Sequence, residues 1–107
     1  MPVNLPPLKI LVVTAPISLS LNTADLIRID ATLVDIVLTL APATGSGRVV
    51  YFKRVDTTLS HTVWLEAPVG SLLCGLHSRH PLQAHEETIA LVDVAPGIWE
   101  ALSRSIL

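Results

Sequence analysis

Four potential metal ligands occur within one short segment of the chain: Cys74, His77, His80 and His85. Thiolate and imidazole are ligands that zinc prefers, and the Cys-x2-His-x2-His spacing would let a single loop fold around the ion. Structural zinc sites usually take their ligands as two pairs from separate elements, however, and Arg79 adds a positive charge here. The segment 76–85 is therefore predicted to be a polar loop without a bound metal or other cofactor. Zinc binding is one alternative, and a site for an ion on the three-fold axis of a trimer, lined by histidines of all three chains, is another.

The sequence contains no complete motif for catalysis by a serine nucleophile or by a pair of carboxylates. Ser46 stands directly between two glycines, but a nucleophile elbow needs glycines two positions away on each side and a strand-to-helix turn. Glu86 and Glu87 are adjacent, so on a strand their side chains point to opposite faces and do not form a general acid–base pair. We expect a flexible connection at Ser46, a solvated strand edge at the two glutamates, weak ion pairs from the charged run 53–56, and no enzymatic activity.

The composition is rich in apolar side chains and poor in charge, with 50% hydrophobic and 15% charged residues in 107 and a net charge of −2. This excludes a disordered tail, and seven Lys and Arg residues against nine acids exclude a basic nucleic-acid binder. No apolar stretch reaches the roughly 18 residues that a membrane span needs. The single cysteine cannot form an internal disulfide, which fits folding in a reducing cytoplasm. Leu, Val and Ile occupy 38 positions, more than one small domain is expected to bury, so we expect self-association.

The elements that must position these residues are predicted to be short β-strands. Val, Ile and Thr favour strands, and the prolines recur at intervals that suit strands rather than long helices. Apolar patterning and turn signals predict strands over residues 17–21, 25–30, 32–40, 48–56, 61–67, 72–74, 87–94 and 98–102. Short strands at a spacing of about ten residues indicate an all-β fold, a small antiparallel β-sandwich or barrel of the jelly-roll type.

Several apolar residues are candidates for an interface between subunits. The segment 32–40 carries apolar side chains on both faces, as expected for a strand that its own subunit covers on one side and a partner on the other. Trp64 and Trp99 are predicted to lie in the core or in an interface, because a glycan site would need several clustered, exposed aromatic rings. The interface candidates are Val3, Leu5, Leu8, Ile10, Leu33, Val37, Trp64 and Trp99. Residues 1–24 are predicted to form an N-terminal arm with one or more strands, which attaches to a coat protein or pairs with a neighbouring subunit, and residues 25–107 the β-sandwich domain.

A series of short motifs follows Asp25 in the sequence. In chain order they are Ile27-Arg28-Ile29-Asp30, Val37-Leu38-Thr39-Leu40-Ala41-Pro42, Gly47-Arg48, Phe52-Lys53-Arg54-Val55-Asp56, Thr62-Val63-Trp64-Leu65, Gly70, Leu73, Gly75 and Gly97-Ile98-Trp99. In order and spacing these motifs resemble a small β-domain found at the C-termini of bacteriophage tail fibres and related virion proteins. The chain departs from the family pattern where Leu-Pro becomes Leu40-Ala41-Pro42, and residues 1–24 lie outside the resemblance.

The resemblance implies a homotrimer of β-domains without catalytic residues, which contacts other virion proteins or a host surface. The sequence shows no shaft or adaptor that would mount the domain on a tail, so we expect a capsid decoration or cement protein that stabilises the shell. Its partners would be its own copies and the major capsid protein or other virion proteins. A tail-fibre tip or receptor-binding head that contacts a host surface glycan is the first alternative, and a small metal- or glycan-binding β-domain is the second. The expected location is the virion, assembled in the host cytoplasm.

Overall fold

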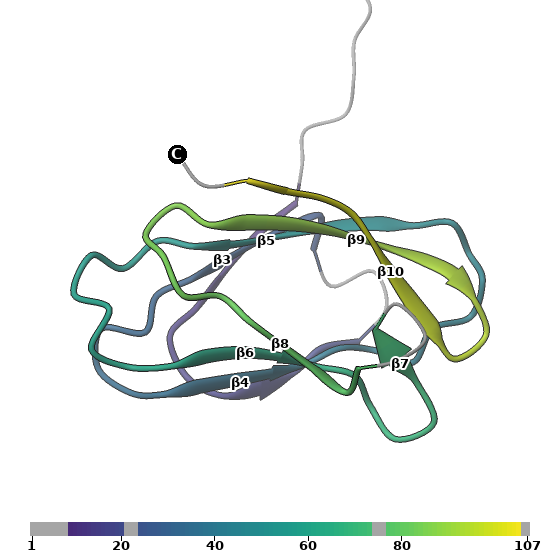
Figure 1. Cartoon of the computed structure of the whole chain (residues 1–107), viewed down its shortest axis with the longest axis horizontal. Coiled ribbons are helices and arrows are strands. Elements are labelled where there is room, and N and C mark those ends of the chain that lie inside the picture. Colours follow the sequence, from purple (N-terminus) through teal and green to yellow (C-terminus); the bar gives the residue numbers. More distant parts are fainter. Residues whose placement is uncertain (1–8, 21–23, 74–76, 106–107) are drawn as a thin grey trace, which may run out of the picture.

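The computed structural model describes residues 9–20, 24–73 and 77–105, and within these ranges it contains ten β-strands and no helix. Figure 1 shows the strands in two layers that face each other. In chain order they are β1 (Ile10–Val13), β2 (Ile17–Ser18), β3 (Leu26–Ile29), β4 (Ile36–Thr39), β5 (Val49–Arg54), β6 (Val63–Glu66), β7 (Leu72–Leu73), β8 (Arg79–Pro81), β9 (Thr88–Ala95) and β10 (Ile98–Ser105). No helix in this part of the chain is long and apolar enough to span a membrane.

The first six strands alternate between the two sheets. β1, β3 and β5 are successive neighbours in a six-stranded sheet, and β2, β4 and β6 are successive neighbours in a four-stranded sheet. Within both sets the pairing is parallel. The chain therefore passes through the two sheets three times, and each turn stacks on the one before it in a solenoid-like arrangement.

The C-terminal strands extend both sheets with a different pairing. β9 runs antiparallel to β5, and β10 returns antiparallel to β9 as the second arm of a hairpin. In the other sheet β8 runs antiparallel to β6, while the short β7 pairs in parallel with β10. The strand orders are β1-β3-β5-β9-β10-β7 and β2-β4-β6-β8.

The prediction of an all-β chain is confirmed, but the prediction of antiparallel sheets is wrong for the first six strands. Alternating apolar residues indicate which face of a strand is buried, and they carry no information on the direction of the neighbouring strand. Parallel neighbours need a crossover of about a dozen residues or more. Here a strand of the opposite sheet lies within each crossover, and in sequence such a strand looks the same as a hairpin partner.

The core lies between the sheets and is built from the inward faces of the stacked turns. In β5, Val50 and Phe52 are buried, whereas Tyr51 points outward and is 43% exposed, as the alternation predicts. The register places Leu11, Ile27 and Phe52 side by side on the inner face of the six-stranded sheet. Each turn of the chain thus adds a layer to the core. Full burial of one Leu, Ile or Phe side chain contributes about 2 kcal/mol to the stability of the fold.

Two segments contain strands that the sequence predicts only in part or not at all. Within the predicted arm, β1 pairs with β3 and β2 pairs with β4, so residues 10–18 are integral to both sheets. The predicted polar loop over 76–85 contains β8, which pairs with β6. Residues 10–13 and 79–81 contain too few residues in regular alternation to indicate a strand, whereas the alternation over 17–21 predicts the strand in which β2 lies. Pairing with a neighbouring strand stabilises the extended conformation of these short segments.

The predicted strand over 32–40 is shorter in the structure, where β4 begins at Ile36. The carboxylate of Asp30 accepts hydrogen bonds from the backbone N–H and the hydroxyl of Thr32, which turns the chain after β3. Leu33 lies just beyond this turn and is 81% exposed. Part of the exposed apolar surface of residues 32–40 therefore lies in the connection before β4 rather than in the strand itself.

Candidate functional site

The four potential metal ligands do not converge in the part of the chain that the structure describes. Cys74 lies outside the described residues. His77 forms an isolated β-bridge, His80 lies in β8, and His85 precedes β9, with its Nδ1 atom 3.2 Å from the carbonyl oxygen of Asp56. Among the described side chains, no group of three or more His, Cys, Asp or Glu residues is placed to hold a metal ion.

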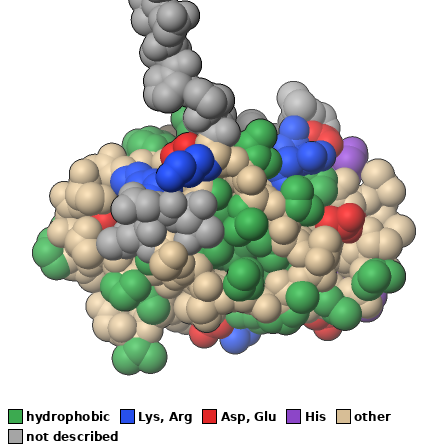
Figure 2. Space-filling model, turned by 180° about the vertical axis from the view of Figure 1, so that it is seen from behind, with side chains coloured by type: hydrophobic (Ala, Val, Ile, Leu, Met, Phe, Trp, Pro, Cys, Tyr) green, Lys and Arg blue, Asp and Glu red, His purple; other side chains and the backbone are tan. Residues whose placement is uncertain are grey.

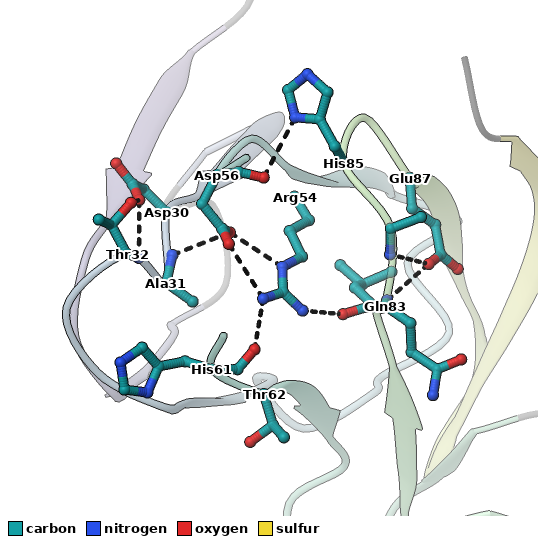
Figure 3. A network of polar contacts seen from close by, with 12 residues as sticks. Asp30, Ala31, Thr32, Arg54, Asp56, His61, Thr62, Gln83, His85 and Glu87 are labelled. Atoms are coloured by element: carbon teal, nitrogen blue, oxygen red, sulfur yellow. Dashed lines mark hydrogen bonds and ion pairs between the residues drawn. The ribbon is translucent and has the colours of Figure 1, made fainter. Parts of the chain in front are cut away.

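A buried ion pair of Arg54 and Asp56 occupies one end of the sheets (Figure 3). Arg54 has the same strand parity as Val50 and Phe52, so its side chain points inward, and the residue is only 2% exposed. Its Nε atom donates to Oδ1 of Asp56 at 3.0 Å, and its Nη2 atom donates to Oδ2 at 3.1 Å. The pairing is therefore bidentate, the geometry that best satisfies both a guanidinium and a carboxylate.

The same pair ties three loops together. The Nη1 atom of Arg54 donates to the carbonyl oxygen of Leu82 at 2.7 Å, and Nη2 donates to the carbonyl oxygen of His61. Asp56 accepts a further hydrogen bond from the backbone N–H of Ala31 at 3.1 Å. These partners follow β8, β5 and β3, so one ion pair fixes the ends of strands from both sheets.

Asp56 is held in its ionised form by these contacts. Burial alone would raise the pKa of Asp56, but hydrogen bonds from the Arg54 guanidinium and from the Ala31 backbone outweigh burial, and the pKa lies below its ordinary value. The net stability of such a pair is small, because desolvation offsets the attraction, whereas loss of one partner is strongly destabilising. The ion pair thus holds these loops in position.

Glu87 continues the network on the β9 side. It is fully buried, and its Oε1 atom accepts hydrogen bonds from the backbone N–H groups of Gln83 at 2.7 Å and Ala84 at 3.1 Å. Glu86 instead forms an ion pair with Lys53. Both glutamates precede β9 in a turn rather than on a strand, and they make separate contacts. The prediction of a solvated edge is wrong for Glu87, because its turn folds back over the carboxylate.

A cleft with a volume of about 170 Å³ lies beside Arg54. Its lining includes Arg54, His61, Thr62, Trp64 and Gln83, together with aliphatic side chains from the same segments. Thr62 and Gln83 are exposed, so the cleft opens to solvent. In Figure 3, His61 and Thr62 lie on one side of the Arg54 guanidinium and Gln83 lies on the other.

At the opposite end of the sheets, Asp93 on β9 anchors a single loop. It is fully buried, and its Oδ1 atom accepts hydrogen bonds from the backbone N–H groups of Thr44 at 2.8 Å and Gly45 at 2.6 Å. The hydroxyls of Thr44 and Ser46 donate to the other oxygen, at 2.9 Å and 2.8 Å. Burial raises the pKa of Asp93, but these four hydrogen bonds outweigh burial and lower the pKa to about 2. Ser46 is therefore a structural donor, and its loop is anchored rather than a free connection.

Some of the predicted interface residues lie in the core or outside the described part of the chain. Val3, Leu5 and Leu8 fall outside the described residues. Trp99 is only 3% exposed, and its indole N–H donates to the carbonyl oxygen of Ala41 at 2.8 Å. Trp99 is thus covered by its own chain.

The other interface candidates reach the surface. Ile10 and Leu33 are 59% and 81% exposed. Val37 and Trp64 are register neighbours on β4 and β6, and both are half-buried on the outer face of the four-stranded sheet. These four residues belong to different surfaces, so they do not form one continuous patch by themselves.

The sequence analysis missed the structural role of the buried charges. The alternation in 48–56 gives Arg54 the same parity as Phe52, which indicates an inward side chain, but the opposite charges of 53–56 suggested only weak pairs at a strand end. For Asp93, the inward parity shared with Leu91 was the available signal. Neither pattern identifies the hydrogen-bond partners, since most of them are distant in sequence.

Comparisons with known proteins give no relative from which the role of this site could be inferred. No protein-family model matches the chain, and no curated protein matches it. The geometry alone defines the site as a loop-positioning ion pair with a solvent-accessible cleft beside it.

Proposed function

We propose that the chain is a non-enzymatic structural protein of a bacteriophage virion, a homotrimeric capsid decoration protein that stabilises the shell by contacting the major capsid protein. The observation that carries the self-association is an apolar row on the outer face of the six-stranded sheet. Ile10, Leu26 and Tyr51 are neighbours in register on β1, β3 and β5. Ile10 and Tyr51 are 59% and 43% exposed, and Val12 beside them is 55% exposed.

Exposed apolar side chains extend beyond this row. Among the described residues, eleven large hydrophobic side chains are at least 40% exposed. Figure 2 shows hydrophobic side chains gathered along the middle of one face, with Lys and Arg side chains near its upper border. Large exposed apolar patches are uncommon on monomeric soluble proteins and mark sites of association.

The assignment to a virion rests on the motifs that resemble tail-fibre β-domains. These motifs coincide with successive elements of the fold, with Ile27–Asp30 at β3, Val37–Pro42 at β4 and Phe52–Asp56 at β5. Buried charges also support a structural role, because Arg54 and Asp93 are engaged in holding loops. We therefore assign the chain to assembly rather than to catalysis.

Light scattering on the purified protein tests the trimer. We expect a mass three times that of the 11.5 kDa chain at micromolar concentration. Tyr51→Glu places a charge in the outer apolar row and should give a folded species of monomeric mass, while Ser18→Glu, at an exposed site on the other sheet, should leave the trimer intact. A wild-type mass of 11.5 kDa would refute the trimer.

The number of copies in each particle tests the location on the shell. Quantitative gel analysis of purified virions should find hundreds of copies, because a decoration protein covers a repeating lattice. A few trimers in each particle would refute decoration and favour the alternative, a tail-fibre tip.

A further inference from the structure

We propose that the open edge of β1 is a docking site for an extended, acidic peptide segment of another protein, which adds a strand to the six-stranded sheet. β1 stands first in the strand order β1-β3-β5-β9-β10-β7, so one of its sides has no neighbour among the described strands. The chain here accepts a strand from its partner. This inference does not depend on the proposed place of the protein in a virion.

The first argument is the direction of the peptide groups in β1. The carbonyl oxygens of Lys9 and Val13 accept hydrogen bonds from backbone N–H groups at the two ends of β3. Because the peptide groups of alternate residues point to the same side of a strand, those of Ile10 and Val12 point away from β3. No described residue forms a backbone hydrogen bond with them. Two donors and two acceptors are thus available to an added strand.

The second argument is that β1 lacks the features that protect the other sheet edges. β2 is two residues long and follows Pro16, β8 contains Arg79 and Pro81, and His77 bridges the two-residue β7. β10 has a register shift where it runs beyond β7. Short strands, charges, prolines and bulges all discourage pairing with another chain. β1 consists of four apolar residues in continuous register with β3, so among the described edges it is the one that favours strand addition.

The third argument is the place of β1 at the first turn of the stack. Each later turn covers the one before it, but no described turn stacks on β1. Leu11, on the inner face of β1, packs against the core and is nevertheless only partly buried. An apolar side chain of a partner strand beside Leu11 would extend the core by one layer.

The charges around this edge determine which peptide fits. Lys9 precedes β1, and Arg28 lies on the outer face of β3; both are exposed, and neither forms an ion pair with a described side chain. The carboxylate of Asp30 lies beyond the other end of β3. An added strand would lie about 10 Å from β3, a distance that a partner glutamate and the long side chain of Arg28 can span together.

The same charges distinguish a foreign segment from a second copy of this chain. The edge strand of a second copy, Ile10–Val13, carries no carboxylate and follows Lys9. Such a copy would therefore leave Arg28 without a counter-charge and add a cation, whereas an acidic segment supplies the missing charge. The partner is thus a protein segment with apolar side chains on one face of the strand and glutamate or aspartate on the other.

Nuclear magnetic resonance measurement of amide hydrogen exchange in the purified full chain tests the proposal. The probe is the peptide acetyl-Thr-Val-Glu-Val-Glu-Val-Thr-amide, and its control carries Lys in place of both Glu residues. We expect the probe to bind with a Kd of about 1 mM or below, to slow the exchange of the Ile10 and Val12 amides about five-fold, and to bind roughly 5-fold more tightly than the control. Unchanged exchange at Ile10 and Val12, or equal binding of the two peptides, would overturn the proposal. Slow exchange of both amides in the protein alone would overturn it too, because copies of the chain would then occupy the edge.

A matched pair of variants tests whether the peptide uses the backbone of β1. Val12→Pro removes an N–H that points away from β3, so it should leave the sheet intact and weaken binding at least about 10-fold. Val12→Thr keeps the N–H and the β-branched shape and should bind like the wild type. Thermal unfolding checks that both variants fold. Equal binding by the two variants would contradict strand addition.

Arg28→Gln tests the charge preference at an exposed position that does not affect the backbone. It should bring the affinities of the glutamate and lysine peptides roughly 3-fold closer together. An unchanged preference would show that Arg28 does not face the bound strand, which would overturn the choice of an acidic partner. The mass of the protein by light scattering is a separate measurement, so failure of the trimer and failure of strand addition are distinguishable.

Discussion

The two ends of the sheets both contain a buried carboxylate, and they satisfy it in opposite ways. Asp93 takes four hydrogen bonds from neutral groups of one loop, residues 44–46. Asp56 is paired with Arg54, which also reaches the carbonyl oxygens of two other loops. The contacts of the Asp93 end lie within one loop, whereas the Arg54 end joins loops from both sheets and lies beside a cleft. Neutral donors of one loop suffice to hold a single loop, whereas a charged pair with several remaining hydrogen-bonding atoms fixes loops from both sheets at once.

Removal of Arg54 should produce the largest effect, because it leaves a buried carboxylate without its counter-ion. We expect Arg54→Leu to lower the free energy of unfolding by about 3–5 kcal/mol in urea denaturation. The double variant Arg54→Leu/Asp56→Leu removes both charges and should recover most of that loss. A double variant no more stable than Arg54→Leu would show that the guanidinium acts through its contacts to Leu82 and His61 instead.

This difference between the ends also marks the limit of what the sequence predicts. The alternation correctly separates Phe52 from Tyr51 and gives Arg54 an inward direction. It does not reveal that Asp93 receives its donors from residues about 50 positions earlier, since Thr44 and Asp93 meet only after β5 and β9 have paired. Parallel pairing is hidden for the same reason: it depends on contacts between turns of the chain, and a local pattern reports only burial.

Acid should weaken the Asp93 end by an intermediate amount. The pKa of Asp93 is lowered to about 2 in the folded chain, from an ordinary value of 3.8. The folded state therefore holds the proton less tightly than the unfolded state, so the stabilisation is present above pH 3.8 and is lost as the pH falls toward 2. The loss from this group is about 2 kcal/mol.

Urea denaturation at a series of pH values measures this loss, with Asp93→Asn as the comparison. The variant lacks the titrating group, so its stability should fall less between pH 4 and pH 2 than that of the wild type. Asp56, Glu86 and Asp35 also have lowered pKa values and contribute to the acid dependence of both proteins. Parallel curves for the two proteins would show that the hydrogen bonds of Asp93 do not favour its ionised form.

The smallest effect should come from one donor of the Asp93 set. Ser46→Ala removes the hydroxyl that lies 2.8 Å from the carboxylate and leaves three donors in place, so we expect a loss of about 1 kcal/mol. Ser60→Ala, at an exposed serine near the other end of the sheets, is the matched control and should be neutral. A loss at Ser46 as large as that of Asp93→Asn would mean that the four hydrogen bonds act as one cooperative unit, because removing a single member would then release the whole loop.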